Sequence, residues 1–300
     1  MTQALYRGRF APSPTGPLHF GSLITALGSY LDAKSQGGEW WLRIDDLDPP
    51  RVAPGAIDAI LRAMEAYGLA WDGAVQYQRQ RGEAYAAALA GLQGLGVVYA
   101  CACSRREIAD SSIGRPGAPV YPGICRAGLA PGKIARALRV DTRGACVDFA
   151  DRLQGAVMQD LEREAGDFIV QRADGLFAYQ LAAVVDDAEL GITDIVRGAD
   201  LLDSTLRQVY LRRLLDLPLP RYLHLPVAVN ALGEKLSKQT LAPPLDMAHP
   251  QPALVQALRF LNHAPPQALE GAETREILAW AVQNWSVARI PAVRSMEPQI

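Results

Sequence analysis

The stretch of sequence that decides the fold is Arg9-Phe10-Ala11-Pro12-Ser13-Pro14-Thr15-Gly16-Pro17-Leu18-His19-Phe20-Gly21-Ser22. A β-like run, Tyr6 to Ala11, leads into it, and an apolar-periodic run, Leu23 to Leu31, follows it. Between these runs, prolines and a glycine interrupt regular structure. The order predicts a strand, a tight loop and a helix. The N-terminus of such a helix favours phosphate binding, because its first N–H groups are free and its dipole is positive there.

Two residues of this loop suit a phosphate-bearing ligand. His19 is a donor that can contact a phosphate, and Gly21 lets a flat ring approach the backbone. The alternative is an ordinary proline-rich loop with a surface histidine, because short motifs have many chance matches. A second stretch far along the chain favours the phosphate interpretation.

That second stretch is Gly233-Glu234-Lys235-Leu236-Ser237-Lys238-Gln239-Thr240. It follows a β-like run from Leu223 to Val229, which places it in a loop after a strand. The chain has four lysines, and two of them bracket the serine of this loop. Their mobile ammonium groups can reach toward a polyphosphate, although a solvated basic loop is the alternative.

Length and composition indicate a soluble globular protein of 300 residues, with 49% hydrophobic and 21% charged residues. This length exceeds the usual size of one domain, so we expect a main domain with an insertion or appendage. The formal net charge of −2 argues against a surface coated with nucleic acid, so any RNA contact should come from a local arginine-rich face. The sequence shows no N-terminal apolar run and no long apolar stretch, which predicts a cytoplasmic protein without signal peptide or membrane span.

The pattern of elements predicts a doubly wound parallel sheet. In the first half we expect a strand at 39–44, helices at about 54–67 and 82–92, and a strand at 96–100. A strand at 167–172 then resumes the sheet, and a hairpin turn at Asp174-Gly175 leads to an apolar run over 177–187. A strand at 192–200, a helix to 214 or 215 and two late helices at 251–262 and 273–284 complete the pattern.

The segment from Cys101 to about Leu153 breaks this pattern, and we interpret it as an insertion. Cys101 and Cys103 are too close for an easy mutual bridge, so reduced thiols are expected. Together with Cys125 they suit a tetrahedral zinc site, because zinc prefers thiolates and structural sites have four ligands. The fourth ligand would be Cys146, Tyr121, an aspartate or water. The alternative is a set of reduced, buried cysteines.

Polar residues also follow two predicted strands. Asp45, Asp46 and Asp48 come directly after the strand at 39–44, where open α/β sheets bind ligands, although capping and turn roles are commoner for aspartates. Arg197 precedes a glycine near the end of the run at 192–200, and an arginine can bind a carboxylate through two parallel hydrogen bonds.

Both Arg197 and Tyr179 have structural alternatives. Arg197 could be a surface salt-bridge partner of Asp194 or Asp200. Tyr179 lies in an apolar run, where a core aromatic residue with a satisfied hydroxyl is the commoner case.

The two signature stretches together resemble a known family. His19-Phe20-Gly21-Ser22 and Lys235-Leu236-Ser237-Lys238-Gln239 resemble the paired HIGH and KMSKS signatures of class I aminoacyl-tRNA synthetases. The stretch from Arg9 to Gly16 and the run Arg43-Ile44-Asp45-Asp46-Leu47-Asp48 narrow the resemblance to the glutamyl branch. The resemblance covers about Tyr6 to Asp246.

Two further features resemble one group within that branch. A Cys-x-Cys followed by Tyr-x-x-x-Cys is similar to the glutamyl-queuosine tRNA-Asp synthetases. About sixty residues follow the KMSKS-like loop, whereas glutamyl-tRNA synthetases continue there with a large anticodon-binding region. The resemblance implies a Rossmann-type α/β fold with a zinc-binding insertion and a short helical C-terminal region. We expect the first half of the catalytic domain at 1–100, the insertion at 101–155, the second half at 156–243 and the helical region at 244–300.

The resemblance also assigns roles to residues. It implies that His19, Lys235 and Lys238 are catalytic, and that ATP is bound by His19, Gly21 and Lys238. The glutamate pocket that it implies contains Arg9, Phe10, Ala11, Pro12, Ser13, Asp45, Tyr179 and Arg197. The family has a glutamate at the position of Asp45 to hold the α-ammonium group of the substrate, so this side chain is one methylene shorter. The implied zinc ligands are Cys101, Cys103, Tyr121 and Cys125, with Cys146 as a structural cysteine.

The activity implied by the resemblance has two steps. Glutamate is activated by ATP without tRNA, and the glutamyl group is then transferred to queuosine in the anticodon loop of tRNA-Asp. The implied cofactors are structural Zn²⁺ and Mg²⁺ with ATP, and the implied partners are ATP, L-glutamate and tRNA-Asp carrying queuosine. We expect a monomer that binds neither membrane nor DNA. The alternatives are a small-molecule adenylate-forming enzyme, a discriminating glutamyl-tRNA synthetase, and a zinc-stabilised RNA-binding protein without catalytic activity.

Overall fold

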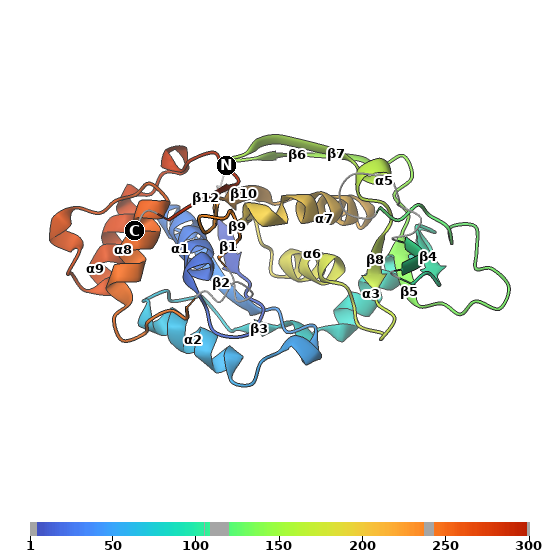
Figure 1. Cartoon of the computed structure of the whole chain (residues 1–300), viewed down its shortest axis with the longest axis horizontal. Helices are drawn as coiled ribbons and strands as arrows, with labels where there is room; N and C mark the ends of the chain where they lie inside the picture. The colour runs from blue at the N-terminus through green and yellow to red at the C-terminus, as the bar shows by residue number, and fades with distance from the viewer. Residues whose placement is uncertain (1–4, 105, 109–119, 237–242, 299–300) are drawn as a thin grey trace.

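The computed structural model describes residues 5–104, 106–108, 120–236 and 243–298, and Figure 1 shows their arrangement. Its centre is made of two sheets whose main strands run parallel. The first sheet has the order β1-β2-β3, formed by β1 (Arg7–Phe10), β2 (Glu39–Ile44) and β3 (Gln76–Tyr77). The second has the order β7-β6-β10-β9, formed by β6 (Cys146–Asp151), β7 (Gly155–Asp160), β9 (Asp194–Gly198) and β10 (Arg221–Leu225).

The two sheets meet where β1 and β9 lie side by side. The backbone N–H of Thr193 donates to the carbonyl of Arg7 at 2.9 Å, and the N–H of Arg7 donates to the hydroxyl of Thr193 at 2.9 Å. The chain leaves β1 toward β2 and leaves β9 toward β10, which lie on opposite sides of this junction. The sheet order therefore reverses between β1 and β9, and such a switch point is where doubly wound folds bind ligands.

Helices follow the strands of both halves, as the sequence predicts. The helices are α1 (Phe20–Ser35), α2 (Ala56–Ala66), α3 (Gly82–Gly94), α5 (Leu161–Glu164), α6 (Tyr179–Glu189), α7 (Leu202–Leu214), α8 (Pro250–Phe260) and α9 (Thr274–Asn284). Among the described parts of the chain, no helix is both long enough and apolar enough to span a membrane. The α/β class with parallel strands and helices is confirmed, and the two late helices begin and end within two residues of their predicted bounds.

A separate antiparallel sheet corrects the prediction for two strands. β4 (Val98–Cys101), β5 (Ala137–Val140) and β8 (Phe168–Gln171) pair antiparallel in the order β4-β5-β8. The runs at 96–100 and 167–172, which we expected in the parallel sheet, belong to this sheet instead. Strand pairing is set by partners distant in sequence, so a correctly identified strand can still be placed in the wrong sheet. The expected boundary after residue 100 also falls within β4.

The hairpin expectation for 167–187 is correct only at its base. An isolated antiparallel bridge joins Gln171 to Phe177, and the apolar run that follows is the helix α6. Its residues are buried on nearly all sides, from Leu181 to Asp187, so no period distinguishes a helix from a buried strand. The predicted strand over 223–229 is divided between β10 and β11 (Val227–Ala228), and β11 pairs with β12 (Ser295–Met296).

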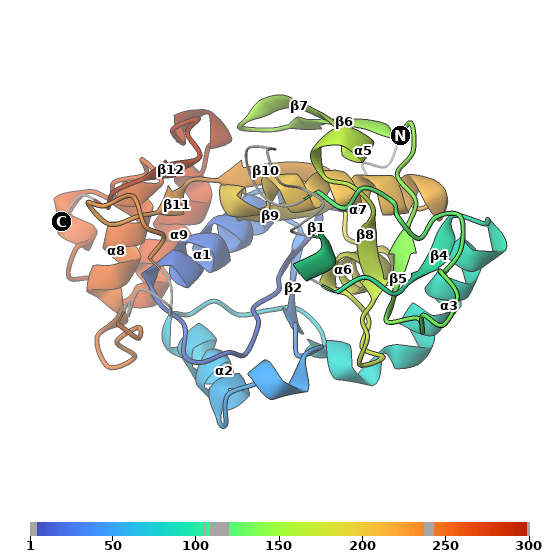
Figure 2. The same ribbon diagram turned by 45° about the vertical axis from the view of Figure 1, so that its right-hand side comes forward.

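The main core surrounds α1, the helix that Figures 1 and 2 show between α8 and the strands β1 and β2. Leu23, Leu27 and Leu31 of this helix are fully buried against a cluster that includes residues of β1, β2, α2, α8 and α9. Each fully buried leucine stabilises the fold by roughly 1.5–3 kcal/mol relative to an exposed one. In both views α8 and α9 lie at one end of the molecule and the β4-β5-β8 sheet lies at the other. The first turn of α1, which follows β1, is therefore held by packing along the rest of the helix.

The packing of α1 against β10 gives a test of this core. A Cβ added at Gly28 would lie 2.5 Å from Cδ1 of the buried Leu225, so Gly28→Ala should destabilise the protein by about 1–2 kcal/mol despite the better helix propensity of alanine. The matched control is Gly91→Ala in α3, where the added Cβ meets only Leu215 Cδ2 at 3.7 Å and should stabilise the protein by about 0.5–1 kcal/mol. Urea unfolding measures both changes. Equal changes in the free energy of unfolding of the two variants would contradict close packing at Gly28.

Candidate active site

A cavity of about 600 Å³ opens where the carboxyl ends of β1 and β9 meet. Its walls come from the segment after β1, the first turn of α1, the first residue of α6, the end of β9 with the turn η3 (Ala199–Leu201), and the loop after β11. The structure brings most of the predicted site residues to this cavity, namely Arg9, Phe10, Ala11, Pro12, Ser13, His19, Gly21, Tyr179, Arg197 and Lys235. Its position is that expected for a ligand site in a doubly wound sheet.

His19 and Gly21 form the helix side of the cavity. His19 is the N-cap of α1, and its Nδ1 accepts the backbone N–H of Ser22 at 3.4 Å. A Cβ added at Gly21 would lie 3.0 Å from the carbonyl oxygen of Leu236. The first turn of α1 and the loop that carries Lys235 therefore approach closely, and glycine is what permits this approach. The first signature stretch and Lys235-Leu236, the described start of the second, lie together although more than 200 residues separate them in the chain.

Lys235 extends over the end of β9. Its Nζ lies 2.5 Å from Oδ2 of Asp200 in η3, and about half of its side chain is exposed. Lys238, Ser237 and Gln239 lie outside the described residues. The position of the second lysine of the signature therefore stays a prediction.

Arg9 lines the cavity from β1 and is held by a buried carboxylate of α6. Its Nε and Nη2 donate to Asp187 at 3.0 and 3.2 Å, and Nη1 of Arg43 donates to the same carboxylate at 2.7 Å. Burial alone would raise the pKa of Asp187, but the Arg9 and Arg43 guanidinium groups lower it well below its usual range. Asp187 is therefore a stable anion that fixes Arg9 in one orientation.

Asp45 lies behind the cavity wall. Arg43 Nε donates to its carboxylate at 2.6 Å, and the backbone N–H of Asp45 donates to the carbonyl of Pro12 at 3.0 Å. Burial raises the pKa of Asp45, against the opposite effect of Arg43. Asp45 is not among the described residues that line the cavity. Its contact with an ammonium group stays a prediction, and the structure shows that its carboxylate compensates the charge of Arg43.

Arg197 faces Arg9 across the junction of β1 and β9 and is only 3% exposed. It donates to neutral acceptors, which are Oγ1 of Thr205 at 2.6 Å, Oε1 of Gln208 at 2.8 Å and Nε2 of His224 at 3.2 Å. Its Nη1 lies 3.5 Å from the hydroxyl of Tyr179. Among the described residues no carboxylate pairs with Arg197. The negative charge that would compensate this buried cation can therefore come from a ligand.

The surface salt-bridge alternative for Arg197 is wrong. Asp194 pairs with Arg221 at 2.8 Å and with Arg152 at 3.5 Å, and Asp200 pairs with Lys235. Both carboxylates that a surface arginine could use are therefore engaged elsewhere.

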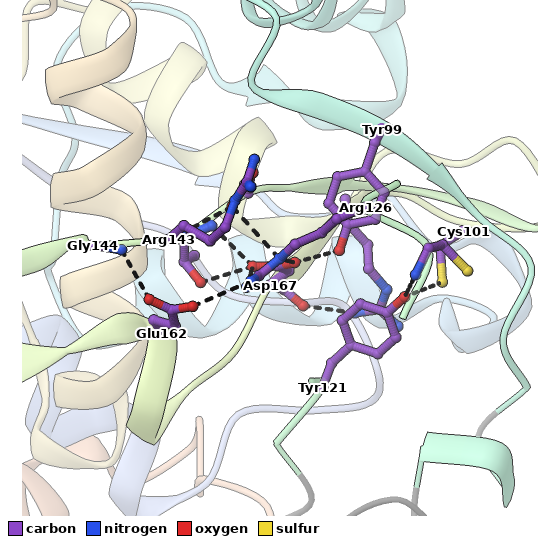
Figure 3. A network of polar contacts seen from close by, with 12 residues as sticks. Tyr99, Cys101, Tyr121, Arg126, Arg143, Gly144, Glu162 and Asp167 are labelled. Carbon is purple, nitrogen blue, oxygen red and sulfur yellow. Dashed lines mark hydrogen bonds and ion pairs between the residues drawn. The ribbon is translucent and has the colours of Figure 1, made fainter. Parts of the chain in front are cut away.

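A second site lies in the segment that follows β4. The Sγ atoms of Cys101, Cys103 and Cys125 lie within 4.8 Å of one another, with 3.6 Å between those of Cys103 and Cys125. The Tyr121 hydroxyl points at this group, 3.4 Å from Sγ of Cys101 and 3.8 Å from that of Cys103, and it accepts the backbone N–H of Cys125 at 3.0 Å. Figure 3 shows the Tyr121 ring directed toward Cys101. Cys146 lies on β6, is exposed and is not part of the group.

A network around Asp167 holds this cluster, as Figure 3 shows. Arg126 donates to both carboxylate oxygens of Asp167, at 2.6 and 2.7 Å, and the Tyr99 hydroxyl donates to the same carboxylate. The Arg139 guanidinium carbon lies 4.0 Å from the centre of the Tyr121 ring. Burial raises the pKa of the Cys103 thiol to about 11, and the adjacent Cys125 thiol adds to this. The ring and thiols are therefore fixed by β4, β5 and the residue before β8.

Comparison with known proteins identifies the family. Residues 6–270 match the family described as tRNA synthetases class I (E and Q), catalytic domain. A protein of Aromatoleum aromaticum named glutamyl-Q tRNA(Asp) synthetase is 55% identical over 95% of this chain and 90% of its own length. A protein of Dechloromonas aromatica with the same name is 56% identical over 95% of this chain and 96% of its own length. The chain belongs to this family of class I synthetases.

Solved structures agree with this assignment at the level of the fold. The glutamate-tRNA synthetase of Elizabethkingia anophelis superimposes with a TM-score of 0.79 and 24% identity, over 96% of this chain and 67% of that one. The resemblance drawn from the two signature stretches is therefore confirmed. This synthetase shares its fold with a protein that extends well beyond the matched part.

The groups that hold the site residues escaped the sequence analysis. Asp187 contacts Arg9 and His224 contacts Arg197, yet neither lies in a recognisable motif. A signal for Asp187 was present, because two consecutive aspartates end an apolar run where charged residues are rarely buried without partners. No local signal distinguishes His224, because its partners Asp151 and Arg197 lie on other strands.

The buried Asp187 gives a prediction for stability. Asp187→Asn leaves Arg9 and Arg43 without their shared counter-charge and should cost about 3–5 kcal/mol of unfolding free energy at neutral pH. The pKa of Asp187 is lower in the folded protein than in the unfolded chain, where it is about 3.9. The ionised Asp187 therefore contributes fully to the free energy of unfolding above about pH 3.9, and this contribution is lost as the pH falls below that value. The difference between wild type and variant should therefore shrink as the pH is lowered from about 5 to about 2.

Urea unfolding at several pH values measures this difference. The control is Glu65→Gln on the exposed face of α2, which should change the unfolding free energy by less than about 0.5 kcal/mol. A pH-independent difference between wild type and Asp187→Asn would show that Asp187 is not the stabilising anion.

Proposed function

We propose that this synthetase activates L-glutamate with ATP in the absence of tRNA and transfers the glutamyl group to queuosine in the anticodon loop of tRNA-Asp. The observation that carries the proposal is the buried Arg197, which lines the cavity without a carboxylate partner among the described residues. A substrate carboxylate supplies the missing charge. The names of the relatives, which are at least half identical to this chain, support glutamate and queuosine as substrates.

The cavity has two walls with different chemistry. Arg9, Arg197 and Tyr179 form a polar wall suited to the carboxylates of an amino acid. His19, Gly21 and the first turn of α1 form a wall suited to phosphates, with Lys235 on the loop opposite. This arrangement would place an amino-acid carboxylate beside the α-phosphate of ATP. Mg²⁺ would enter bound to the phosphates of ATP, as is usual for this ion.

The proposed reaction needs alignment and charge stabilisation more than covalent participation of the protein. An oxygen of the α-carboxylate attacks the α-phosphorus, a new P–O bond forms, and the bond to the departing pyrophosphate breaks. His19 and Lys238 would stabilise the negative charge on the phosphorus oxygens and on pyrophosphate. A ring hydroxyl of queuosine then attacks the carbonyl carbon of glutamyl-adenylate, AMP leaves with the bonding electron pair, and the phosphate of the departing AMP would take the proton of the hydroxyl.

We also propose that Cys101, Cys103, Tyr121 and Cys125 hold a structural zinc ion. Zn–S bonds of about 2.3 Å and Zn–O bonds of about 2.0 Å give tetrahedral edges of about 3.8 Å between two sulfurs and about 3.5 Å between sulfur and oxygen. The observed 3.6 Å between sulfurs and 3.4 and 3.8 Å to the Tyr121 oxygen fit these edges. Such an ion would link the strand β4 to the loop at 121–125 and keep both in place.

The experiment that tests the activity is the transfer of labelled glutamate to purified tRNA. We expect label on tRNA-Asp that carries queuosine, and none on the same tRNA with guanosine or on tRNA-Glu. Label on tRNA-Glu would instead indicate a discriminating glutamyl-tRNA synthetase. Glutamate-dependent exchange of pyrophosphate into ATP without label on any tRNA would indicate a small-molecule adenylate-forming enzyme, and the absence of both reactions would contradict the proposal.

The ligand set gives a separate prediction for metal content. Cys101→Ser and Cys125→Ser should lose the bound zinc, and Tyr121→Phe should weaken zinc binding by about tenfold or more, measured by metal analysis and by competition with a chelator. The control is Cys146→Ser, which removes an exposed cysteine outside the cluster and should keep its zinc. Loss of zinc in the control together with retention in Tyr121→Phe would make Cys146 the fourth ligand.

A further inference from the structure

We propose that His224 and Asp151 are positioning residues that fix the orientation of the Arg197 guanidinium in the cavity. The inference rests on the proposed function, because the task of Arg197 there is to bind a carboxylate of the amino-acid substrate. Neither residue lines the cavity among the described parts of the chain, so both would act through Arg197.

The three side chains form a continuous buried line across three neighbouring strands. Oδ2 of Asp151, at the end of β6, lies 2.6 Å from Nδ1 of His224 on β10, and Nε2 of His224 lies 3.2 Å from Nε of Arg197 on β9. His224 is directly paired with Arg197 in the β10–β9 register, and Tyr222 is paired with Asp151 between β10 and β6. Because the line follows the sheet, its geometry is set by backbone pairing.

The hydrogen bonds assign one tautomer to His224. The carboxylate of Asp151 accepts, so Nδ1 carries the proton, and Nε2 is left with a lone pair. That lone pair faces the Nε–H of Arg197 at 3.2 Å and the hydroxyl oxygen of Thr205 at 2.8 Å, and of these two groups the guanidinium can only donate. Burial lowers the pKa of His224, in keeping with a neutral ring beside a guanidinium group. The opposite tautomer would place an N–H against an N–H.

This line leaves one part of Arg197 for the substrate. Of its five N–H donors, Nε–H is directed to His224, and the Nη2 group is directed to Thr205 and Gln208. Nη1 lies 3.5 Å from the hydroxyl of Tyr179, and Tyr179 lines the cavity. The guanidinium is thereby locked on its inner side and presents Nη1 to the cavity.

A neutral residue between arginine and carboxylate has a physical advantage here. Asp187 contacts Arg9 directly and compensates its charge, whereas Asp151 reaches Arg197 only through the imidazole ring. A carboxylate in direct contact with Arg197 would occupy the N–H groups that are needed to bind the substrate. It would also compensate the positive charge that attracts the substrate carboxylate. The Asp151–His224 pair orients Arg197 and leaves its charge available.

The test uses two substitutions that each keep one side of the ring. In His224→Gln the terminal amide oxygen stands near the position of Nε2 and can still accept from Arg197. In His224→Asn the amide nitrogen stands near the position of Nδ1 and can still donate to Asp151, but the acceptor for Arg197 is lost. Pyrophosphate exchange measured against glutamate and against ATP separates KM for each substrate from kcat.

We expect His224→Asn to raise KM for glutamate by about ten- to a hundredfold, as loss of a hydrogen bond to a charged group does, with KM for ATP changed less than about threefold. His224→Gln should keep KM for glutamate within about threefold of wild type. Asp151→Asn is the second variant. Oδ1 of Asp151 accepts the backbone N–H groups of Leu153, Gln154 and His224, so the amide oxygen should keep that side and turn its N–H toward Nδ1, which forces the wrong tautomer. This variant should raise KM for glutamate as His224→Asn does.

Thermal melting of each variant shows whether it is folded. If His224→Asn does not fold, KM for glutamate in Asp151→Asn tests the inference instead. Equal KM values for glutamate in the His224→Gln and His224→Asn variants, or an equal rise of KM for ATP, would overturn this inference alone. Absence of glutamate-dependent exchange in the wild-type chain would overturn the proposed function and the inference with it.

Discussion

The junction of β1 and β9 is the constraint on which the site depends. Two hydrogen bonds between Arg7 and Thr193 join strands that are more than 180 residues apart in the chain. Because the chain leaves the two strands in opposite directions, their carboxyl ends stay uncovered and form the floor of the cavity. Arg9 comes from one strand and Arg197 from the other. Their separation is therefore set by the contact between two strands, which the hydrogen bonds of Arg7 and Thr193 hold together.

Charge is distributed unequally over this floor. Arg9 and Arg43 contact Asp187 and Asp45, and Asp186 lies 3.8 Å from Arg43, so both of these buried cations have carboxylate partners. Arg197 has neutral acceptors only, among the described residues, and remains one positive charge in excess. Transfer of an unmatched charge from water into a protein interior costs several kcal/mol. That free energy is offset when a ligand carboxylate binds, which couples affinity to the charge of the ligand.

Much of the fold and of the cavity was predictable from local sequence signals. The prolines and glycine before His19 mark a loop between a strand and a helix, and that loop does form the cavity wall. Spacing alone could not determine the partners of β4 and β8, because antiparallel pairing with β5 depends on residues outside both segments. The role of Asp187 was hidden for the same reason, since its two arginine partners lie on β1 and β2.

The cysteine cluster and the cavity are connected through the chain that follows Asp167. Asp167 binds Arg126 and Tyr99 beside the cluster and directly precedes β8, which pairs with β5. From β8 the chain passes through one tight turn into α6, whose first residue is Tyr179 and whose last turn carries Asp187. A shift of β8 would thus move both the residue that faces Nη1 of Arg197 and the anion that holds Arg9. The segment after β4 therefore contacts, through Arg126 and Asp167, the start of the strand from which the chain continues to the amino-acid side of the cavity.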